Sequence, residues 1–387
     1  GKTDHWAVQL IAANPQARED WRRCEIAAVE VVQAFTSAIG RHASGIASDG
    51  PAGILAGAGA LGSEIFDLWA RSGWGRWTVI DPDQIQPHNL ARHRASERHV
   101  GYDKALVMSA MATTLTSGEP ARHAAIVDAA TNLANNEIRT ALEAAELVVD
   151  VTTTLEFPRD LALNAKVRRA VSAFITPSGR GAVMLLEDAN RALRLDSLEA
   201  QYYRRVISES WGGDHLTGNQ GHLWTGAGCR DVSAIIPNEC VGIHGANLAS
   251  MIRQRTGSPE AALMIWHYDA ARGTLTLDEC TPATTLLDSV GGFDVVWDEQ
   301  VRAKIRGLRK KRLPKETGGV LLGYFDLVSR RVFIVDVLPA PPDSKEEDNG
   351  FVRGISGLEE AVTAVQGRTG HIVGYVGEWH SHPPNHS

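Results

Sequence analysis

Short apolar runs alternate with helix-like stretches along the middle of the chain. Apolar runs at 53–58, 76–83 and 146–154 predict buried strands, and apolar residues at helical spacing in 61–73 and 104–115 predict helices between them. Strands that alternate with helices are typical of a parallel sheet covered by helices on both faces. We therefore expect a doubly wound, mostly parallel α/β sheet in this part of the chain.

A second alternation follows the glycine-containing sequence DSVGG at 288–292. Helical spacing in 298–311 and 357–365 encloses apolar runs at 318–325 and 331–338, and a last apolar run leads into the closing histidines. This order predicts a second, smaller α/β unit.

The patterns divide the 387 residues into three regions, as expected for a chain longer than one ordinary domain. We place an N-terminal helical segment at 1–49, the doubly wound domain at 50–290 and the smaller α/β domain at 291–387. We also expect a hairpin at 262–280 and a polar loop at 340–350.

Composition narrows the class of protein. The formal net charge of −7 gives no reason to expect nucleic-acid binding. No apolar run reaches the roughly 18 residues of a membrane span. The four cysteines stand far apart without a C-x-x-C pair, which argues against a disulfide scaffold and fits a reducing compartment. We therefore expect a cytoplasmic protein that binds neither nucleic acid nor membrane.

A glycine-rich motif marks the first candidate site. Gly57, Gly59 and Gly62 form G-x-G-x-x-G between the first predicted strand and the first helix. Glycines permit a tight turn and let phosphates approach the backbone N–H groups of a helix N-terminus. Asp81 ends the second strand, where dinucleotide-binding proteins hold a ribose hydroxyl. On these four residues alone, a dinucleotide-binding dehydrogenase is an open interpretation.

Further polar residues favour a triphosphate over a dinucleotide. They follow the second and third predicted strands: Asp83, Asn89, Arg92, Lys104 and Asp150. Arginine and lysine neutralise charge that develops on phosphate, and aspartate can hold Mg²⁺. Hydride transfer has little use for such groups. The set therefore favours ATP with Mg²⁺.

The sequence GAGALGSEIFDLWARSGWGRWTVIDPDQIQPHNLARH, with the later YDKA and LVVDVTT, resembles the adenylating core of ubiquitin-activating enzymes and their bacterial relatives of the ThiF/MoeB type. The resemblance implies a Rossmann-like domain in which Asp81, Asn89, Arg92 and Lys104 contact ATP and Asp150 binds the metal. It implies adenylation of the C-terminal glycine of a ubiquitin-like protein. It also implies a homodimer and a conjugating enzyme as partners.

The same resemblance implies a cysteine that captures the modifier as a thioester. Cys229 fits the family pattern best, because it lies in a glycine-containing segment beside Arg230, ahead of the expected helix. Cys240 and the absence of a catalytic cysteine remain alternatives. Two departures from the family are the missing C-x-x-C pairs and Ala91 in place of a glutamine.

The closing histidines mark a second candidate site. His380 and His382 alternate, so that on a strand both rings face one side and can bind one metal. The sequences ETGGVLLG and GEWHSHP resemble the JAB/JAMM (MPN-type) metalloproteases. The resemblance implies Zn²⁺ on both histidines and on a downstream aspartate, with Glu316 as the general base. This sequence holds no aspartate at that position, so we expect an incomplete zinc site and domain here, with Glu378 and His386 as alternative ligands.

The two resemblances predict one combined function. We expect an enzyme that adenylates a ubiquitin-like protein, forms a thioester, and processes or removes the same modifier with its JAB-type domain. Fusions of this kind resemble bacterial ubiquitination-like operons, some of them linked to phage defence. The alternatives are a sulfur-carrier protein adenylyltransferase for cofactor biosynthesis and a scaffold that binds ubiquitin-like proteins without chemistry.

Overall fold

The computed structural model describes residues 34–116, 119–213, 215–216, 222–224 and 232–382. The described residues from 35 to 382 belong to one compact unit. Among the residues described, no helix is long and apolar enough to cross a membrane.

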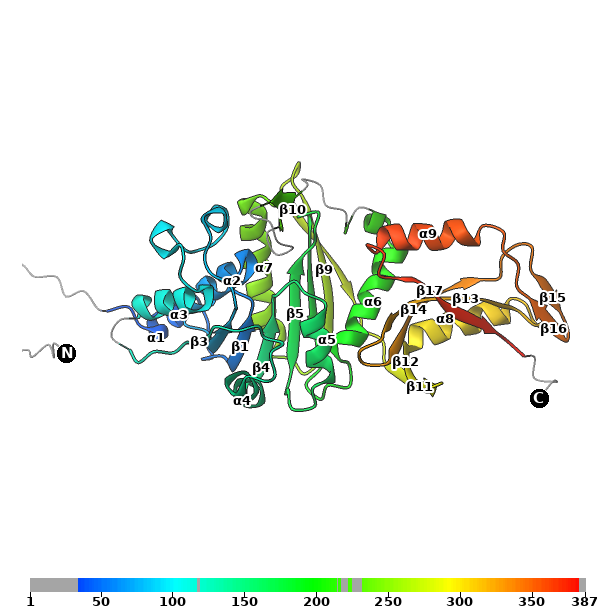
Figure 1. Cartoon of the computed structure of the whole chain (residues 1–387), viewed down its shortest axis with the longest axis horizontal. Coiled ribbons are helices and arrows are strands. Elements are labelled where there is room, and N and C mark those ends of the chain that lie inside the picture. Colours follow the sequence, from blue (N-terminus) through cyan, green and yellow to red (C-terminus); the bar gives the residue numbers. More distant parts are fainter. Residues whose placement is uncertain (1–33, 117–118, 214, 217–221, 225–231, 383–387) are drawn as a thin grey trace, which may run out of the picture. The chain divides into compact units, whose positions relative to one another are not determined.

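An eight-stranded sheet forms the larger domain (Figure 1). Its strands are β1 (Ala52–Ala56), β2 (Arg76–Ile80), β3 (Ala124–Ile126), β4 (Leu147–Asp150), β5 (Ala170–Ile175), β6 (Gly181–Leu186), β9 (Ala262–Asp269) and β10 (Thr274–Cys280), in the order β10-β9-β6-β5-β4-β1-β2-β3. The five strands from β5 to β3 run parallel, and β6, β9 and β10 extend the sheet with antiparallel pairs. The predicted doubly wound, mostly parallel sheet and the hairpin at 262–280 are confirmed.

Helices cover both faces of this sheet because neighbouring strand residues point to opposite sides. Ile54 lies in the core cluster that includes residues of α4 (Asn136–Ala144), α5 (Glu156–Leu163) and α6 (Leu195–Ser208). Leu55 lies in the cluster that includes residues of α2 (Ala60–Arg71), α3 (Lys104–Leu115) and α7 (Asn238–Arg255). The strands are therefore buried on both faces, as their continuous apolar runs predict.

A five-stranded sheet forms the smaller domain. Its strands are β11 (Thr285–Val290), β12 (Phe293–Asp298), β13 (Gly318–Asp326), β14 (Arg331–Pro339) and β17 (Gly374–His380), in the order β11-β12-β14-β13-β17. Its helices are α8 (Glu299–Lys310) and α9 (Leu358–Arg368). The sheet begins at Thr285, within the range that the sequence assigned to the larger domain, because β11 pairs antiparallel with β12.

The remaining elements are short. They are α1 (Ser37–Ala43), the 3-10 helices η2 (Pro87–Ala91), η3 (Glu97–His99) and η4 (Ser210–Gly213), and the strand pairs β7 (His222–Trp224) with β8 (Val232–Ala234) and β15 (Lys345–Glu347) with β16 (Gly350–Val352). The polar loop predicted at 340–350 is therefore wrong in part, because β15, the whole turn after it and the first residue of β16 lie there. The turn sequence Asp348-Asn349-Gly350 suits such a reversal.

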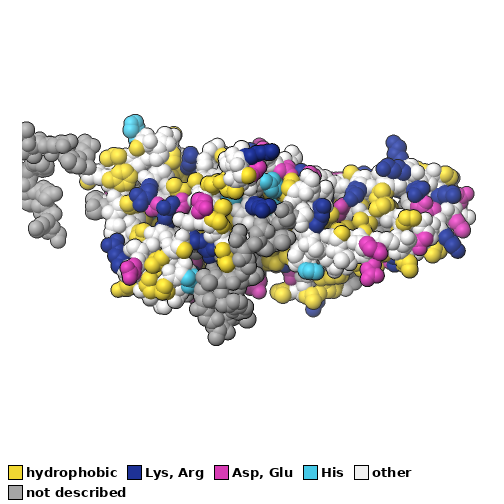
Figure 2. Space-filling view, turned by 90° about the horizontal axis from the view of Figure 1, so that it is seen from above, with side chains coloured by type: hydrophobic (Ala, Val, Ile, Leu, Met, Phe, Trp, Pro, Cys, Tyr) yellow, Lys and Arg dark blue, Asp and Glu magenta, His cyan; other side chains and the backbone are white. Residues whose placement is uncertain are grey.

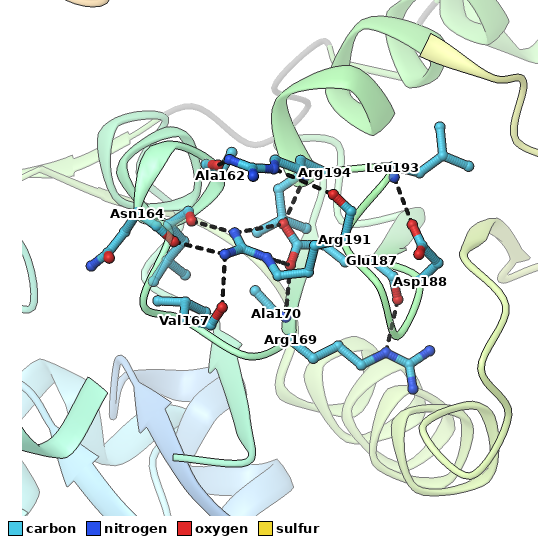
Figure 3. A network of polar contacts seen from close by, with 12 residues as sticks. Ala162, Asn164, Val167, Arg169, Ala170, Glu187, Asp188, Arg191, Leu193 and Arg194 are labelled. Carbon is cyan, nitrogen blue, oxygen red and sulfur yellow. Dashed lines mark hydrogen bonds and ion pairs between the residues drawn. The ribbon is translucent and has the colours of Figure 1, made fainter. Parts of the chain in front are cut away.

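A buried polar network fixes the start of α6 (Figure 3). Glu187 is fully buried and accepts hydrogen bonds from the backbone N–H groups of Ala170 in β5 and Leu195 in α6. Its carboxylate also pairs with Arg191, at 2.7 Å from Nε. Arg191 has a positive φ of 55° and donates further hydrogen bonds to the carbonyls of Leu161, Asn164 and Val167. Glu187 thus joins β5, the turn after β6 and α6.

Helix α6 also bonds to residues of the smaller sheet. Asp196 pairs with Arg331 of β14 at 2.6 Å, and Arg204 pairs with Asp298, the N-cap of α8, at 2.7 Å. Residues of both sheets lie in one core cluster with residues of α6. The helix is therefore shared by the two domains.

Candidate functional site

The first candidate site lies at the carboxyl edge of the parallel strands. Ala56 at the end of β1 is paired with Ile80 of β2 on one side and with Asp150 of β4 on the other. Asp81 directly follows Ile80, so both predicted acids lie at the same sheet edge as Gly57. This is the edge at which open α/β sheets bind their ligands.

The glycines of the motif serve two different purposes. Gly57 has a φ of +96°, and a Cβ atom there would lie 2.7 Å from the carbonyl oxygen of Val151. A Cβ atom at Gly62 would lie 2.1 Å from the carbonyl oxygen of Gly57. Gly59, the N-cap of α2, has no heavy atom within 4 Å of its Cβ position. The first and third glycines permit close packing, and the second leaves space at a helix N-terminus, where phosphates bind.

Asp81 holds the glycine loop through a hydrogen bond to its backbone. Its carboxylate accepts hydrogen bonds from the backbone N–H groups of Ala58, at 2.6 Å, and Asp83, at 2.9 Å. Burial raises the pKa of Asp81, and the nearby charge of Lys104 opposes this rise. Lys104 is 9% exposed and its Nζ pairs with Asp83 at 2.8 Å. The structure therefore brings these acids and the lysine together beside the loop.

Asn89 and Arg92 lie in the segment after β2. Asn89 accepts a hydrogen bond from the backbone N–H of Gln86 at 2.9 Å, which gives it a role in shaping η2. Arg92 is half-buried and donates to the carbonyl oxygen of Ile236 at 3.4 Å. Burial lowers the pKa of Arg92. This hydrogen bond ties the segment after β2 to the residues just before α7.

Asp150 is buried and hydrogen-bonded through both carboxylate oxygens. Oδ1 accepts from the backbone N–H and hydroxyl of Thr152, and Oδ2 accepts from the hydroxyl of Ser172 at 2.7 Å. Burial raises the pKa of Asp150, and these hydrogen bonds oppose the rise. A magnesium ion would therefore share an acid already fixed by its neighbours. Across the described ranges, no group of three or more His, Cys, Asp or Glu side chains is arranged to hold a metal ion.

His93 is a site residue that the sequence prediction missed. Its Nδ1 accepts a hydrogen bond from the backbone N–H of Ala95 at 2.9 Å, so Nε2 carries the proton and donates it to the carbonyl of Ala58 at 2.7 Å. Ala58 also donates to Asp81, so the middle of the glycine loop is held from two sides. The sequence offered one sign that His93 belongs to the site, which is its position directly after the predicted site residue Arg92.

Replacement of His93 by glutamine should make the unfolding free energy depend less on pH below pH 7. Burial lowers the pKa of His93 from 6.5 to about 4. The unfolded chain therefore takes up a proton below pH 6.5 while the folded chain does not, so His93 destabilises the fold as the pH falls. From pH 7 to pH 5 the wild type should lose about 2 kcal/mol more of its unfolding free energy than the variant, measured by urea unfolding. Equal losses in both proteins would contradict the neutral, buried state of His93.

The candidate thioester cysteine, Cys229, lies outside the described residues. The alternative, Cys240, lies at the start of α7, and burial raises the pKa of its thiol with a smaller contribution from Glu239. Burial likewise raises the pKa of Cys280 in β10. A raised pKa lowers the thiolate fraction, so neither described cysteine has the environment of an activated nucleophile.

The second candidate site joins the ends of two paired strands. Gly318 at the start of β13 is paired with His380 at the end of β17, which brings the segment after Glu316 beside the histidines. Nε2 of His380 lies 3.0 Å from Nε2 of His382, and Nδ1 of His382 lies 3.1 Å from Oε1 of the buried Glu316. Two converging imidazole nitrogens with a carboxylate behind one of them fit the donor set and support of a zinc site.

The alternative third ligands are in different situations. The carboxylate of Glu378 binds Arg353 at 2.8 Å and the hydroxyl of Tyr375 at 3.1 Å, so it is engaged by these residues. His386 lies outside the described residues. The structure therefore brings together His380, His382 and Glu316.

Models of two protein families match separate parts of the chain. The model of the ThiF family matches residues 53–176, and the model of prokaryotic homologs of the JAB domain matches residues 298–387. The chain therefore carries a ThiF-type adenylation domain followed by a prokaryotic JAB-type domain, which confirms both resemblances.

A curated relative and several solved structures are also similar to the chain. The CD-NTase/cGAS isopeptidase of Enterobacter hormaechei subsp. hoffmannii (strain UCI 50) is 41% identical over 68 residues, which cover 18% of this chain and 36% of the relative. The chain thus spans about a third of that relative's length. E. coli MccB is 14% identical with a TM-score of 0.42 and 61% of this chain and 64% of MccB covered. PaaA is 14% identical with a TM-score of 0.42 and 59% and 72% covered.

Proposed function

We propose that the chain adenylates the C-terminal glycine of a ubiquitin-like protein with ATP and then binds it as a thioester on Cys229. One observation carries the proposal: the ThiF-type domain places an open helix N-terminus at Gly59 beside Asp81 and the buried cation Lys104. Backbone N–H groups and a nearby cation are the features that a triphosphate requires.

The reaction uses the predicted residues in separate roles. The glycine carboxylate attacks the α-phosphorus of ATP, the bond to the β-phosphate oxygen breaks, and pyrophosphate leaves. Arg92 and Lys104 stabilise the charge that develops on the phosphates, while Asp81, Asp83 and Asn89 shape the loop that holds the nucleotide. Asp150 would hold Mg²⁺, which supplies charge neutralisation on the phosphates.

In the second step the thiolate of Cys229 attacks the carbonyl carbon of the acyl-adenylate, and AMP leaves. Replacement of Cys229 by alanine should therefore abolish the reducible adduct and leave adenylate formation intact. The adduct is measured on gels with and without reductant, and the adenylate by pyrophosphate exchange. Cys240→Ala is the matched control and should keep the thioester. A reducible adduct on the Cys229 variant would reject the assignment.

We also propose that the JAB-type domain hydrolyses the bond after the modifier's C-terminal glycine. The converging His380 and His382 would supply two ligands to Zn²⁺, with a third ligand that the described residues do not supply. The metal would activate a water molecule as the nucleophile. Glu316, beside His382, would act as the general base. The isopeptidase name of the curated relative supports this class of reaction.

The wider setting belongs to the same proposal. A conjugating enzyme would accept the modifier from Cys229, and the adenylation domain would act as a homodimer in the cytoplasm. The pathway would be bacterial, ubiquitination-like and linked to phage defence. The name of the curated relative, CD-NTase/cGAS isopeptidase, supports this setting.

A further inference from the structure

After its first residue, Glu299, helix α8 and the loop that follows it carry a run of cations and no acids. Residues 300–315 contain eight Lys and Arg residues and no Asp or Glu, although the whole chain has a formal net charge of −7. The face shown in Figure 2, in contrast, mixes Lys and Arg with Asp and Glu side chains. The run therefore forms a local exception to the charge of the chain.

Half of these cations have partners in the fold. The structure pairs Arg302 with Glu299, Lys304 with Asp336 and Arg312 with Glu346, and Arg309 donates to the carbonyl of His382. The others are exposed, and within the described ranges the structure records no ion pair for them: Arg306, Lys310, Lys311 and Lys315. We call these four residues the α8 cationic surface.

The helix dipole accounts for only part of this surface. A helix C-terminus favours cations in its last turn, where Lys310 lies. Arg306 precedes that turn, and Lys315 lies beyond the helix. Arg306 and Lys310 are also spaced i, i+4, where like charges destabilise a helix. The surface thus costs folding energy that an acidic partner would offset.

The α8 cationic surface adjoins the candidate peptidase site. Arg309 donates from Nη2 to the backbone carbonyl of His382 at 2.8 Å. Lys315 directly precedes Glu316. A ligand held on these cations therefore lies next to the residues proposed to cleave the modifier.

We propose that the α8 cationic surface binds an acidic face of the modifier itself, and this rests on the hydrolysis proposed for the JAB-type domain. The modifier is the one component shared by precursor processing and by removal from varied targets, so a fixed charged surface suits it best. Because the chain is acidic as a whole, an acidic modifier is repelled elsewhere and directed to this surface.

A variant with Arg306→Gln, Lys310→Gln and Lys311→Gln tests whether the surface binds acidic polypeptide. The probe is a fluorescein-labelled deca-glutamate peptide, measured by anisotropy at low salt. The Kd should rise about tenfold in this variant. It should stay unchanged in a control with Arg98→Gln, Lys166→Gln and Arg272→Gln, exposed cations of the larger domain. Equal binding to both variants, or tighter binding of a ten-residue thymidine oligonucleotide, would overturn the proposal.

Cleavage assays then separate the modifier from its targets. The substrates are the ubiquitin-like protein that supports pyrophosphate exchange, fused to aminomethylcoumarin or to a folded protein. If the surface recognises the modifier, the variant with Arg306→Gln, Lys310→Gln and Lys311→Gln should show a higher KM than wild type with both leaving groups. Its rate of pyrophosphate exchange should be unchanged. A rise in KM with the protein leaving group alone would assign the surface to the target and overturn the proposal. If wild type cleaves neither substrate while the deca-glutamate difference persists, the proposed hydrolysis fails and the acidic-ligand surface stands.

Discussion

Replacement of Lys104 by alanine is expected to lower the rate of pyrophosphate exchange by about 10²–10³-fold, the usual effect of removing one preorganised electrostatic contact to a transition state. Lys104 is almost fully buried and is held beside the glycine loop by Asp83 at 2.8 Å. Its ammonium group therefore costs no reorganisation when charge develops on the phosphates. The exchange assay follows the rate in the presence of a ubiquitin-like protein.

Lys166→Ala is the matched control for this prediction. Lys166 is exposed and pairs with Glu143 far along the chain from the glycine loop. Its loss should leave exchange unchanged. The unfolding temperature of both variants shows whether either has lost its fold. Exchange that survives in a folded Lys104 variant would remove this residue from the ATP site.

Replacement of Glu187 by alanine should lower the unfolding free energy by about 3–5 kcal/mol, because it leaves the buried Arg191 without its carboxylate. The change also removes the acceptor for the backbone N–H groups of Ala170 and Leu195. Leu195 begins α6, and α6 bonds to both domains. The substitution should therefore destabilise both domains together. Urea unfolding measures it.

Glu143→Ala removes an exposed ion pair of the same chemical type. Exposed pairs contribute about 0–1 kcal/mol, so this control should unfold nearly as the wild type does. A Glu187 variant that is no less stable than the Glu143 variant would show that the network in Figure 3 does not hold α6 in place.

The fold could be predicted largely because its signals are local. The apolar runs at 53–58 and 146–154 contain the strands β1 and β4, whose residues are buried on both faces of the sheet, and such strands show as continuous apolar sequence. The hairpin of β15 and β16 was missed because its residues are polar and only partly buried. A polar strand of three residues has no hydrophobic pattern that distinguishes it from a loop.

The site was predictable where residues stand in a motif and not where they meet across the fold. Gly57, Asp81 and Lys104 are found by their order in the sequence. Which atoms they bind is set by tertiary contacts, as with the hydrogen bond of Asp81 to Ala58. His93 was missed because the sequence does not show which groups its two ring nitrogens bond. These partners, Ala58 and Ala95, are known only from the folded structure.

The central claim is that the ThiF-type domain forms an acyl-adenylate on a ubiquitin-like tail. The direct measurement is incorporation of labelled pyrophosphate into ATP, with a ubiquitin-like protein whose C-terminal glycine is either intact or deleted. The account predicts exchange with the intact tail only, and loss of that exchange in the Lys104→Ala variant. Binding of the ubiquitin-like protein without any exchange would contradict it and leave a non-catalytic scaffold.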